Sequence, residues 1–250
     1  MNDKRRAIYT HGYHESVLRS HRRRTAENSA GYLLPYLVPG LSVLDVGCGP
    51  GTITVDLAAR VVPGSVTGVE PTDDALSLAR AEAQLHRLSN ISFTTSDVHK
   101  LDFPDDAFDV VHAHQVLQHV ADPVRALQEM RRVCTPGGIV AARDADYSGF
   151  IWFPKLPALD RWLDLYERAA RANGGEPDGS VWCFATASAR EWWGLVWADR
   201  ILQSDLAHQL VDSGLATAAQ LEEISTAWRE WAAAPDGWLA IPHGEILCRA

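Results

Sequence analysis

The sequence predicts an α/β protein built on a doubly wound, mostly parallel sheet of seven strands. The first observation behind this fold class is an alternation along residues 41–145, where short apolar runs bounded by turn residues alternate with stretches of helical spacing. The second observation is a glycine-rich loop between the first apolar run and the first helical stretch. Doubly wound nucleotide-binding sheets begin in this way. Successive β–α–β units of this kind form a parallel sheet.

The strands of this sheet are expected where short apolar runs end in polar residues or glycine. From the N-terminus they are Val43–Val46, Ser65–Glu70, Asn90–Thr95, Val110–Ala113, Ile139–Ala142, Val181–Ala185 and Trp238–Arg249, the last interrupted at Pro242–Gly244. One or two helices are expected before Pro35. Further helices are expected from Thr52 and over Pro71–Leu88, Pro123–Val133, Ala158–Ala172, Ala189–Ser213 and Thr217–Ala233.

Composition limits the classes of function. A chain of 250 residues with 46% apolar and 22% charged residues is typical of one soluble domain or slightly more. The net charge of −9 argues against a nucleic-acid partner, because such partners require a basic surface. The four cysteines are far apart and form no C-x-x-C pair, which indicates reduced thiols and no metal site. No apolar window approaches a membrane span, so we expect a cytoplasmic protein that does not enter a membrane.

The loop after the first strand has the sequence D-V-G-C-G-P-G. Its glycines, Gly47, Gly49 and Gly51, stand at every second position, and Asp45 lies two residues before the first of them. This order differs from the G-x-G-x-x-G of dinucleotide sites, and Pro50 removes an N–H group from the loop. Glycines allow a ligand to approach the backbone closely. The motif resembles the first motif of class I S-adenosylmethionine (SAM)-dependent methyltransferases, which have a Rossmann-like fold.

The resemblance covers residues 40–145 most specifically and is nearest to small-molecule enzymes of the ubiquinone and menaquinone C-methyltransferase type. The segments H-A-H-Q-V-L-Q-H-V and A-A-R-D-A-D-Y also resemble thiol methyltransferases that act on dithiol natural products. The resemblance implies SAM as the cofactor and a small-molecule methyl acceptor, with no metal. One departure concerns Gly174–Ser180, because relatives of this type have a further helix before the strand that begins at Val181.

Several residues are expected to bind the cofactor. Glu70 ends the second strand, 19 residues after Gly51, where an acid accepts hydrogen bonds from ribose hydroxyls. The resemblance implies that Asp97 accepts a hydrogen bond from the adenine amino group and that the N–H of Val98 reaches a ring nitrogen. Arg24 is a candidate for the carboxylate of SAM. The full expected cofactor set is Tyr9, Arg24, Asp45, Gly47, Cys48, Gly49, Gly51, Glu70, Pro71, Asp97, Val98, His114 and Gln115.

Methyl transfer needs position and orientation more than a covalent catalyst, so a base is required only if the acceptor must lose a proton. A thiol is partly ionised near neutral pH and needs little help, whereas a phenol or an alcohol needs more. The candidate bases are His114, His119 and Asp144, together with His11 and His14 from the N-terminal segment. The candidate substrate residues are Tyr13, His14, Arg143, Tyr147, Trp152 and Trp193.

We expect three parts in one continuous domain. Residues 1–37, which include the only basic stretch, form a helical lid; residues 38–148 form the SAM-binding core; residues 149–250 form a cap with the closing strands. All nine tryptophans lie after Gly149, which suggests either an apolar substrate cavity or the core of a helical subdomain. The preferred function is methylation of a heteroatom, best a thiol, of an apolar natural product or metabolite by a monomer or homodimer.

Four other functions compete with this one. An NAD-dependent oxidoreductase is disfavoured by the glycine spacing and by Asp45. A nucleic-acid methyltransferase is disfavoured by the acidic charge and by A-H-Q-V after the fourth strand, where an N-P-P-[YF] tetrapeptide would be expected. O- or C-methylation of a phenolic or quinone-like metabolite remains an alternative, as does a SAM-binding protein without transfer activity.

Overall fold

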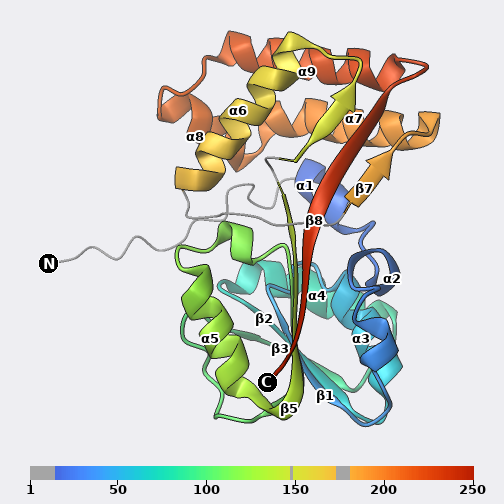
Figure 1. Cartoon of the computed structure of the whole chain (residues 1–250), viewed down its shortest axis with the longest axis vertical. Helices are drawn as coiled ribbons and strands as arrows, with labels where there is room; N and C mark the ends of the chain where they lie inside the picture. The colour runs from blue at the N-terminus through green and yellow to red at the C-terminus, as the bar shows by residue number, and fades with distance from the viewer. Residues whose placement is uncertain (1–14, 147–148, 173–180) are drawn as a thin grey trace, which may run out of the picture. The chain divides into compact units, whose positions relative to one another are not determined.

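The computed structural model of the chain describes residues 15–146, 149–172 and 181–250 (Figure 1). The chain divides into two compact units. The sheet unit consists of His21–Leu117, Asp122–Asp144 and Gly244–Ala250. Of the described residues, the helical unit contains those of 15–20, Gln118–Ala121 and Ala145–His243.

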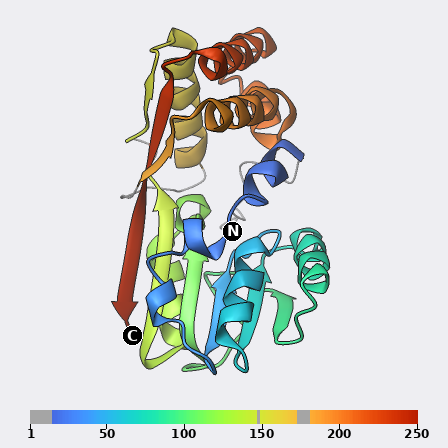
Figure 2. The ribbon, with the colours of Figure 1, turned by 90° about the vertical axis from the view of Figure 1, so that its right-hand side faces the viewer.

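The sheet unit is built on five parallel strands in the order β3-β2-β1-β4-β5, and β8 lies next to β5. The strands are β1 (Ser42–Val46), β2 (Ser65–Glu70), β3 (Ile91–Thr95), β4 (Phe108–His114), β5 (Cys134–Ala145) and β8 (Trp238–Arg249). The crossover helices are α3 (Thr52–Val61), α4 (Asp73–Leu85) and α5 (Pro123–Val133). Figures 1 and 2 show α3 and α5 on opposite faces of this sheet, as expected for a doubly wound fold.

The strand register aligns side chains in rows on the face that α3 covers. Val43 pairs with Val66 and Val110, and this apolar row packs against Ile53, Leu57 and Ala58 of α3. The next row on the same face contains Asp45, Gly68, His112 and Ala141, because side chains of a strand alternate between faces. One further step along three of these strands brings Glu70, His114 and Arg143 to the carboxyl edge of the sheet.

Short helices precede β1: α1 (Glu15–His21), α2 (Ala26–Ser29) and the 3₁₀ turn η1 (Leu34–Tyr36). Thr25 caps α2, since its side chain accepts a hydrogen bond from the backbone N–H of Asn28 and the Asn28 side chain bonds back to Thr25. Ala26, Ala30 and Leu33 are fully buried in the same cluster as α3. Residues 21–37 are therefore an integral part of the core of the sheet unit.

The helical unit packs α6 (Pro157–Ala172), α7 (Ala187–Gln203), α8 (Asp205–Asp212) and α9 (Ala218–Ala233) with a small antiparallel sheet. In this sheet β6 (Ile151–Phe153) and β7 (Val181–Phe184) both pair with β8. Trp162 is completely buried, and its ring lies edge-on at 4.7 Å from Trp197 and 4.8 Å from Trp228. Most of the tryptophans thus form the core of this unit, as one of the two interpretations of their distribution predicted.

The fold class is confirmed, but within the described residues the sheet has eight strands rather than seven. The additional strand is β6, which lies in a stretch expected to lead directly into α6; it forms because Ile151–Phe153 pair with Trp238–Ala240. The last strand is continuous rather than interrupted at Pro242, whose carbonyl accepts a hydrogen bond from Asp146. Proline lacks only the N–H donor and is compatible with pairing through its carbonyl.

Several predicted boundaries were wrong. The helix expected over Ala189–Ser213 is divided into α7 and α8, because Ser204 has extended backbone angles and caps α7 with its N–H. Helix α4 begins at Asp73 instead of Pro71. Strand β5 begins at Cys134, and a shift in register accommodates the residues that were expected to form only a turn. The connection 173–180, where relatives were said to have a further helix, lies outside the described residues.

Candidate functional site

The glycine loop connects β1 to α3 in the sheet unit. Gly47, Gly49 and Gly51 all have positive φ angles, of 68°, 53° and 82°. Gly51 is the N-cap of α3, and a Cβ there would lie 2.9 Å from Cα and Cβ of Ala79, so only glycine fits without displacement. A Cβ on Gly49 would instead meet nothing closer than His21 Nδ1 at 3.9 Å. The backbone beside Gly49 is therefore open to a ligand.

Glu70 lies directly behind this loop. Its Oε1 accepts a hydrogen bond of 2.6 Å from the N–H of Gly49, and the residue is 9% exposed. Burial raises the pKa of Glu70 to about 7; the bond from Gly49 opposes this shift and the charge of Asp45 adds to it. The Cys48 side chain packs with Leu76, Ala79 and Phe93, so only its backbone belongs to the loop. Burial also raises the pKa of Cys48.

Asp45 lies in the row below the loop and is almost completely buried. Its Oδ2 accepts a hydrogen bond from the Thr54 hydroxyl at 2.6 Å, and its Oδ1 lies 2.8 Å from Nδ1 of His112. Because a carboxylate only accepts, Nδ1 of His112 donates. Asp45 thereby joins β1, β4 and α3 under the glycine loop; the direct cofactor contact expected for it stays a prediction. His112 was not among the expected site residues, since only the register of β1 and β4 brings it to Asp45.

Arg24 and Gln115 meet although they lie far apart in the sequence. Arg24 precedes α2, and its guanidinium donates to Oε1 of Gln115 at 2.6 Å. Gln115 follows β4 with a positive φ of 55°, and its N–H donates to the carbonyl of Arg143. These contacts bring two of the expected cofactor residues together at the carboxyl edge of the sheet. Pro71 lies at the same edge, immediately after Glu70, and is exposed.

Arg143 is 4% exposed and lies beside His114 in the register of β4 and β5. Its Nε lies 3.1 Å from Oε1 of Glu245, and its guanidinium donates to the carbonyl of Asn28. Burial lowers the pKa of Arg143, which the nearby Glu245 opposes. The hydroxyl of Tyr32 is buried beside this pair and has no hydrogen-bond partner in the described part of the chain. Burial, followed by the charges of Glu245 and Asp144, raises the pKa of Tyr32.

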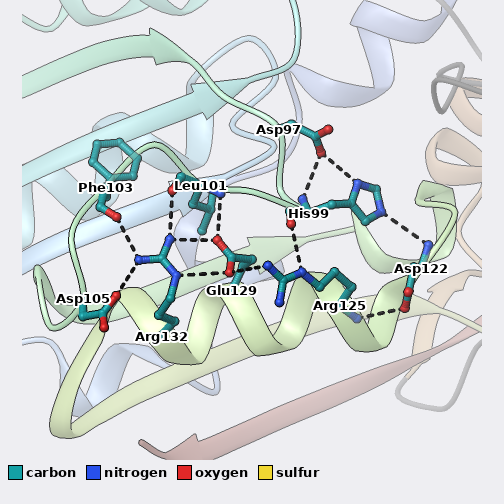
Figure 3. A network of polar contacts seen from close by, with 9 residues as sticks. All are labelled: Asp97, His99, Leu101, Phe103, Asp105, Asp122, Arg125, Glu129 and Arg132. Atoms are coloured by element: carbon teal, nitrogen blue, oxygen red, sulfur yellow. Dashed lines mark hydrogen bonds and ion pairs between the residues drawn. The ribbon is translucent and has the colours of Figure 1, made fainter. Parts of the chain in front are cut away.

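The segment after β3 contains Asp97 and Val98. Oδ1 of Asp97 accepts hydrogen bonds from the backbone N–H and from Nδ1 of His99, at 2.9 and 2.8 Å (Figure 3). The Asp97 side chain is 68% exposed, whereas Val98 is buried. The adenine contact that the resemblance implies for Asp97 stays a prediction.

The candidate bases are divided between the two units. His114 and Asp144 belong to the sheet unit and are 5% and 8% exposed. His119 belongs to the helical unit, and its Nε2 lies 3.0 Å from Nε2 of Gln118. Gln118 in turn accepts a hydrogen bond from the N–H of Ala145 through Oε1.

The candidate substrate residues of the helical unit are buried. Trp152 is 3% exposed, and Trp193 is 6% exposed and stacked on Phe184 at 4.4 Å. Substrate contacts for these rings stay a prediction. The remaining expected residues lie outside the described part of the chain: Tyr9, His11, Tyr13, His14 and Tyr147. Within the described ranges, no group of three histidine, cysteine or acidic residues could hold a metal ion, and no helix is long and apolar enough to cross a membrane.

The residues of the loop fit SAM. Gly49 leaves open space beside the backbone, and the carboxylate behind it suits ribose hydroxyls that donate hydrogen bonds. A buried acid next to the loop would repel a phosphate group, and SAM carries none.

Comparison with known proteins assigns the family. A family model described as "Methyltransferase domain" matches residues 37–214. The chain belongs to the methyltransferase domain family. It is an SAM-dependent methyltransferase, and SAM is its cofactor. A protein from Schizosaccharomyces pombe called an uncharacterized methyltransferase is 34% identical over 266 residues, which cover 96% of this chain and 95% of the relative.

Two further proteins are similar to this methyltransferase, one over about half of the chain and one in its fold. The demethylmenaquinone methyltransferase of Lactococcus lactis is 34% identical over 128 residues, or 51% of this chain and 48% of the relative. The solved structure of the YcgJ protein from Bacillus subtilis covers 90% of this chain and 99% of its own, with 19% identity and a TM-score of 0.53. This last likeness supports the fold alone.

Proposed function

We propose that this methyltransferase transfers a methyl group to a heteroatom of a small, largely apolar molecule, and that the heteroatom is a thiol sulfur. When bound, SAM supplies a methyl group on a sulfonium that a nucleophile can attack. The observation that carries the proposal is the state of the candidate bases: Nε2 of His119 has a hydrogen-bond partner within the fold, and His114 and Asp144 are only 5% and 8% exposed. An acceptor that needs little help with deprotonation suits such a site.

The chain's own residues would bind and orient the cofactor. Glu70 would accept hydrogen bonds from the ribose hydroxyls, and Asp97 from the adenine amino group, with the N–H of Val98 toward a ring nitrogen. Arg24, already held by Gln115 at 2.6 Å, would contact the carboxylate of SAM. Orientation of this kind is the main contribution of a protein to a displacement between two bound molecules.

The apolar character of the acceptor is inferred from the helical unit. Its core is aromatic, and Trp182 and Trp192 are only half-buried, so aromatic surface extends to the boundary of this cluster. Large rigid rings of this kind bind apolar ligands with little loss of side-chain entropy.

The test compares an aryl thiol and a phenol of the same carbon skeleton as acceptors with labelled SAM, in the wild type and in His114→Ala. We expect methylation of the thiol, a rate that rises with pH toward the pKa of the thiol, and a loss in His114→Ala well below the roughly 10²–10⁴-fold typical of a lost general base. A strong preference for the phenol that disappears in His114→Ala would overturn the thiol assignment.

The second candidate is methylation of a phenolic or quinone-like metabolite. The similarity to a demethylmenaquinone methyltransferase over half of the chain favours it. A short-chain demethylmenaquinol included in the same assay distinguishes the two, because faster turnover of this compound than of any thiol would replace the first proposal. Binding of SAM with no turnover of any acceptor would instead indicate a SAM-binding protein without transfer activity.

A further inference from the structure

His99 connects the segment after β3 with the N-terminus of α5. Its Nδ1 lies 2.8 Å from Oδ1 of Asp97, and its Nε2 accepts a hydrogen bond of 3.3 Å from the N–H of Asp122, the N-cap of α5 (Figure 3). A carboxylate can only accept and an N–H can only donate. The two partners therefore select one form of the ring, the neutral imidazole with its proton on Nδ1.

The backbone of the same segment is held independently of this imidazole. Arg125 donates to the carbonyl of His99, and Arg132 donates to the carbonyls of Leu101 and Phe103 (Figure 3). Both guanidinium groups are fixed by Glu129, whose side chain is 3% exposed. Residues 99–103 are thus attached to α5 through main-chain atoms, so loss of the imidazole would leave this attachment in place.

The remaining function of the imidazole concerns the Asp97 side chain. That side chain is 68% exposed, and an exposed carboxylate loses rotational freedom when it binds a ligand. His99 removes this freedom in advance, because its N–H and Nδ1 both donate to Oδ1 of Asp97. The Asp97 side chain is 68% exposed and a carboxylate has about four acceptor positions, so the two donors of His99 do not exclude a hydrogen bond from a ligand.

We propose that His99 is a positioning residue that orients Asp97 to select adenine over a purine with a carbonyl at the same position. The proposal rests on the proposed function in one respect, the assignment of Asp97 to the adenine amino group. Hypoxanthine has an oxygen where adenine has its amino group, so it offers the carboxylate an acceptor in place of a donor. An Asp97 held in one orientation discriminates between them more strongly than a mobile one.

The experiment uses calorimetry with S-adenosylhomocysteine, the demethylated product of SAM, and with its deaminated analogue S-inosylhomocysteine. For the full-length wild type we expect tighter binding of the adenine compound. In His99→Ala the affinity for S-adenosylhomocysteine should fall by about 10-fold, because Asp97 is no longer held in the orientation for its charge-assisted contact with the adenine amino group. The affinity for S-inosylhomocysteine should change little. His99→Asn should restore most of the discrimination, since an amide N–H can replace Nδ1–H toward Asp97 but does not reach Asp122.

The control is His86→Ala, which removes another histidine paired with an acid, Glu82, at the end of α4. It should leave both affinities unchanged. An equal loss for the two ligands in His99→Ala would refute a positioning role, and failure of His99→Asn to restore discrimination would do the same. If Asp97→Ala leaves the wild-type discrimination intact, the assignment of Asp97 itself is wrong. That result is distinguishable from a failure of His99 alone.

Discussion

Asp45 provides a direct test of how the glycine loop is supported. In Asp45→Ala the Thr54 hydroxyl and Nδ1 of His112 lose their partner in a region without solvent access. A hydrogen bond to a charged group contributes about 1.5–3 kcal/mol, and a buried group left without a partner costs about 1–3 kcal/mol. Because the two contacts share one carboxylate, we expect a loss of roughly 3–5 kcal/mol in the free energy of unfolding.

Asp45→Asn should cost less. The amide keeps one acceptor oxygen for Thr54, and its N–H₂ can donate to His112 if the imidazole proton moves from Nδ1 to Nε2. That proton would then be buried without a partner, since Nε2 of His112 has none in the described part of the chain. The expected loss is about 1–3 kcal/mol.

Urea unfolding, monitored by circular dichroism, measures these differences in free energy. The variants can be compared where the slope of the unfolding free energy against urea concentration is unchanged. The control is Asp73→Ala, because Asp73 is 68% exposed and paired with Arg80 on the surface, where an ion pair contributes about 0–1 kcal/mol. If Asp45→Ala is no more destabilising than Asp73→Ala, the buried contacts of Asp45 do not support the loop.

Three further results are expected. The pKa of Glu70 is about 7 in the fold, above its ordinary value of 4.5, so the protonated side chain stabilises the folded state below pH 4.5 and this stabilisation is lost as the pH rises through 7. In urea titrations, the unfolding free energy of the wild type minus that of Glu70→Gln should therefore fall by roughly 3 kcal/mol between pH 4.5 and 8. Gly51→Ala should lower the melting temperature more than Gly137→Ala. The two glycines have nearly the same φ, 82° and 81°, but only at Gly51 would the added Cβ have atoms within 3 Å, so equal shifts in melting temperature would contradict the steric argument. Arg132→Met should lower the free energy of unfolding, measured by calorimetry, by about 2–4 kcal/mol, because the carbonyls of Leu101 and Phe103 and the buried Glu129 lose a donor. The control Arg161→Met removes a surface pair with Glu223 and should lower it by less than about 1 kcal/mol.

The elements that could be predicted are those whose causes are local. Helix α5 has the bounds expected from the sequence, because Pro123 fits the first turn and the helix gives way to strand at Cys134. Strand β2 also has its expected bounds. Strand β6 could not be predicted, since three residues form a strand only where a distant partner, Trp238–Ala240, pairs with them.

The site shows the same division. The glycine loop and Glu70 were identified from spacing along the chain, and the 2.6 Å contact between Gly49 and Glu70 brings them together. Tyr32, Glu245 and His112 were missed, because their importance depends on neighbours 67 to more than 100 positions away in the sequence. No local pattern distinguishes a tyrosine or an acid of this kind from one at the surface.

The contact between Glu70 and Gly49 has a consequence for cofactor binding. The three glycines of the loop have no side chains, so the backbone at these positions depends on the groups beside it: Ala79 at Gly51, and the carboxylate of Glu70 at Gly49. In its ionised form that carboxylate is desolvated and has few donors, which is why its pKa is raised to about 7. Ribose hydroxyls would supply the missing donors without displacing the bond from Gly49, because a carboxylate has about four acceptor positions. The same residue would thus hold the loop in its binding shape before the cofactor arrives and gain its full set of hydrogen bonds only once the ribose is in place.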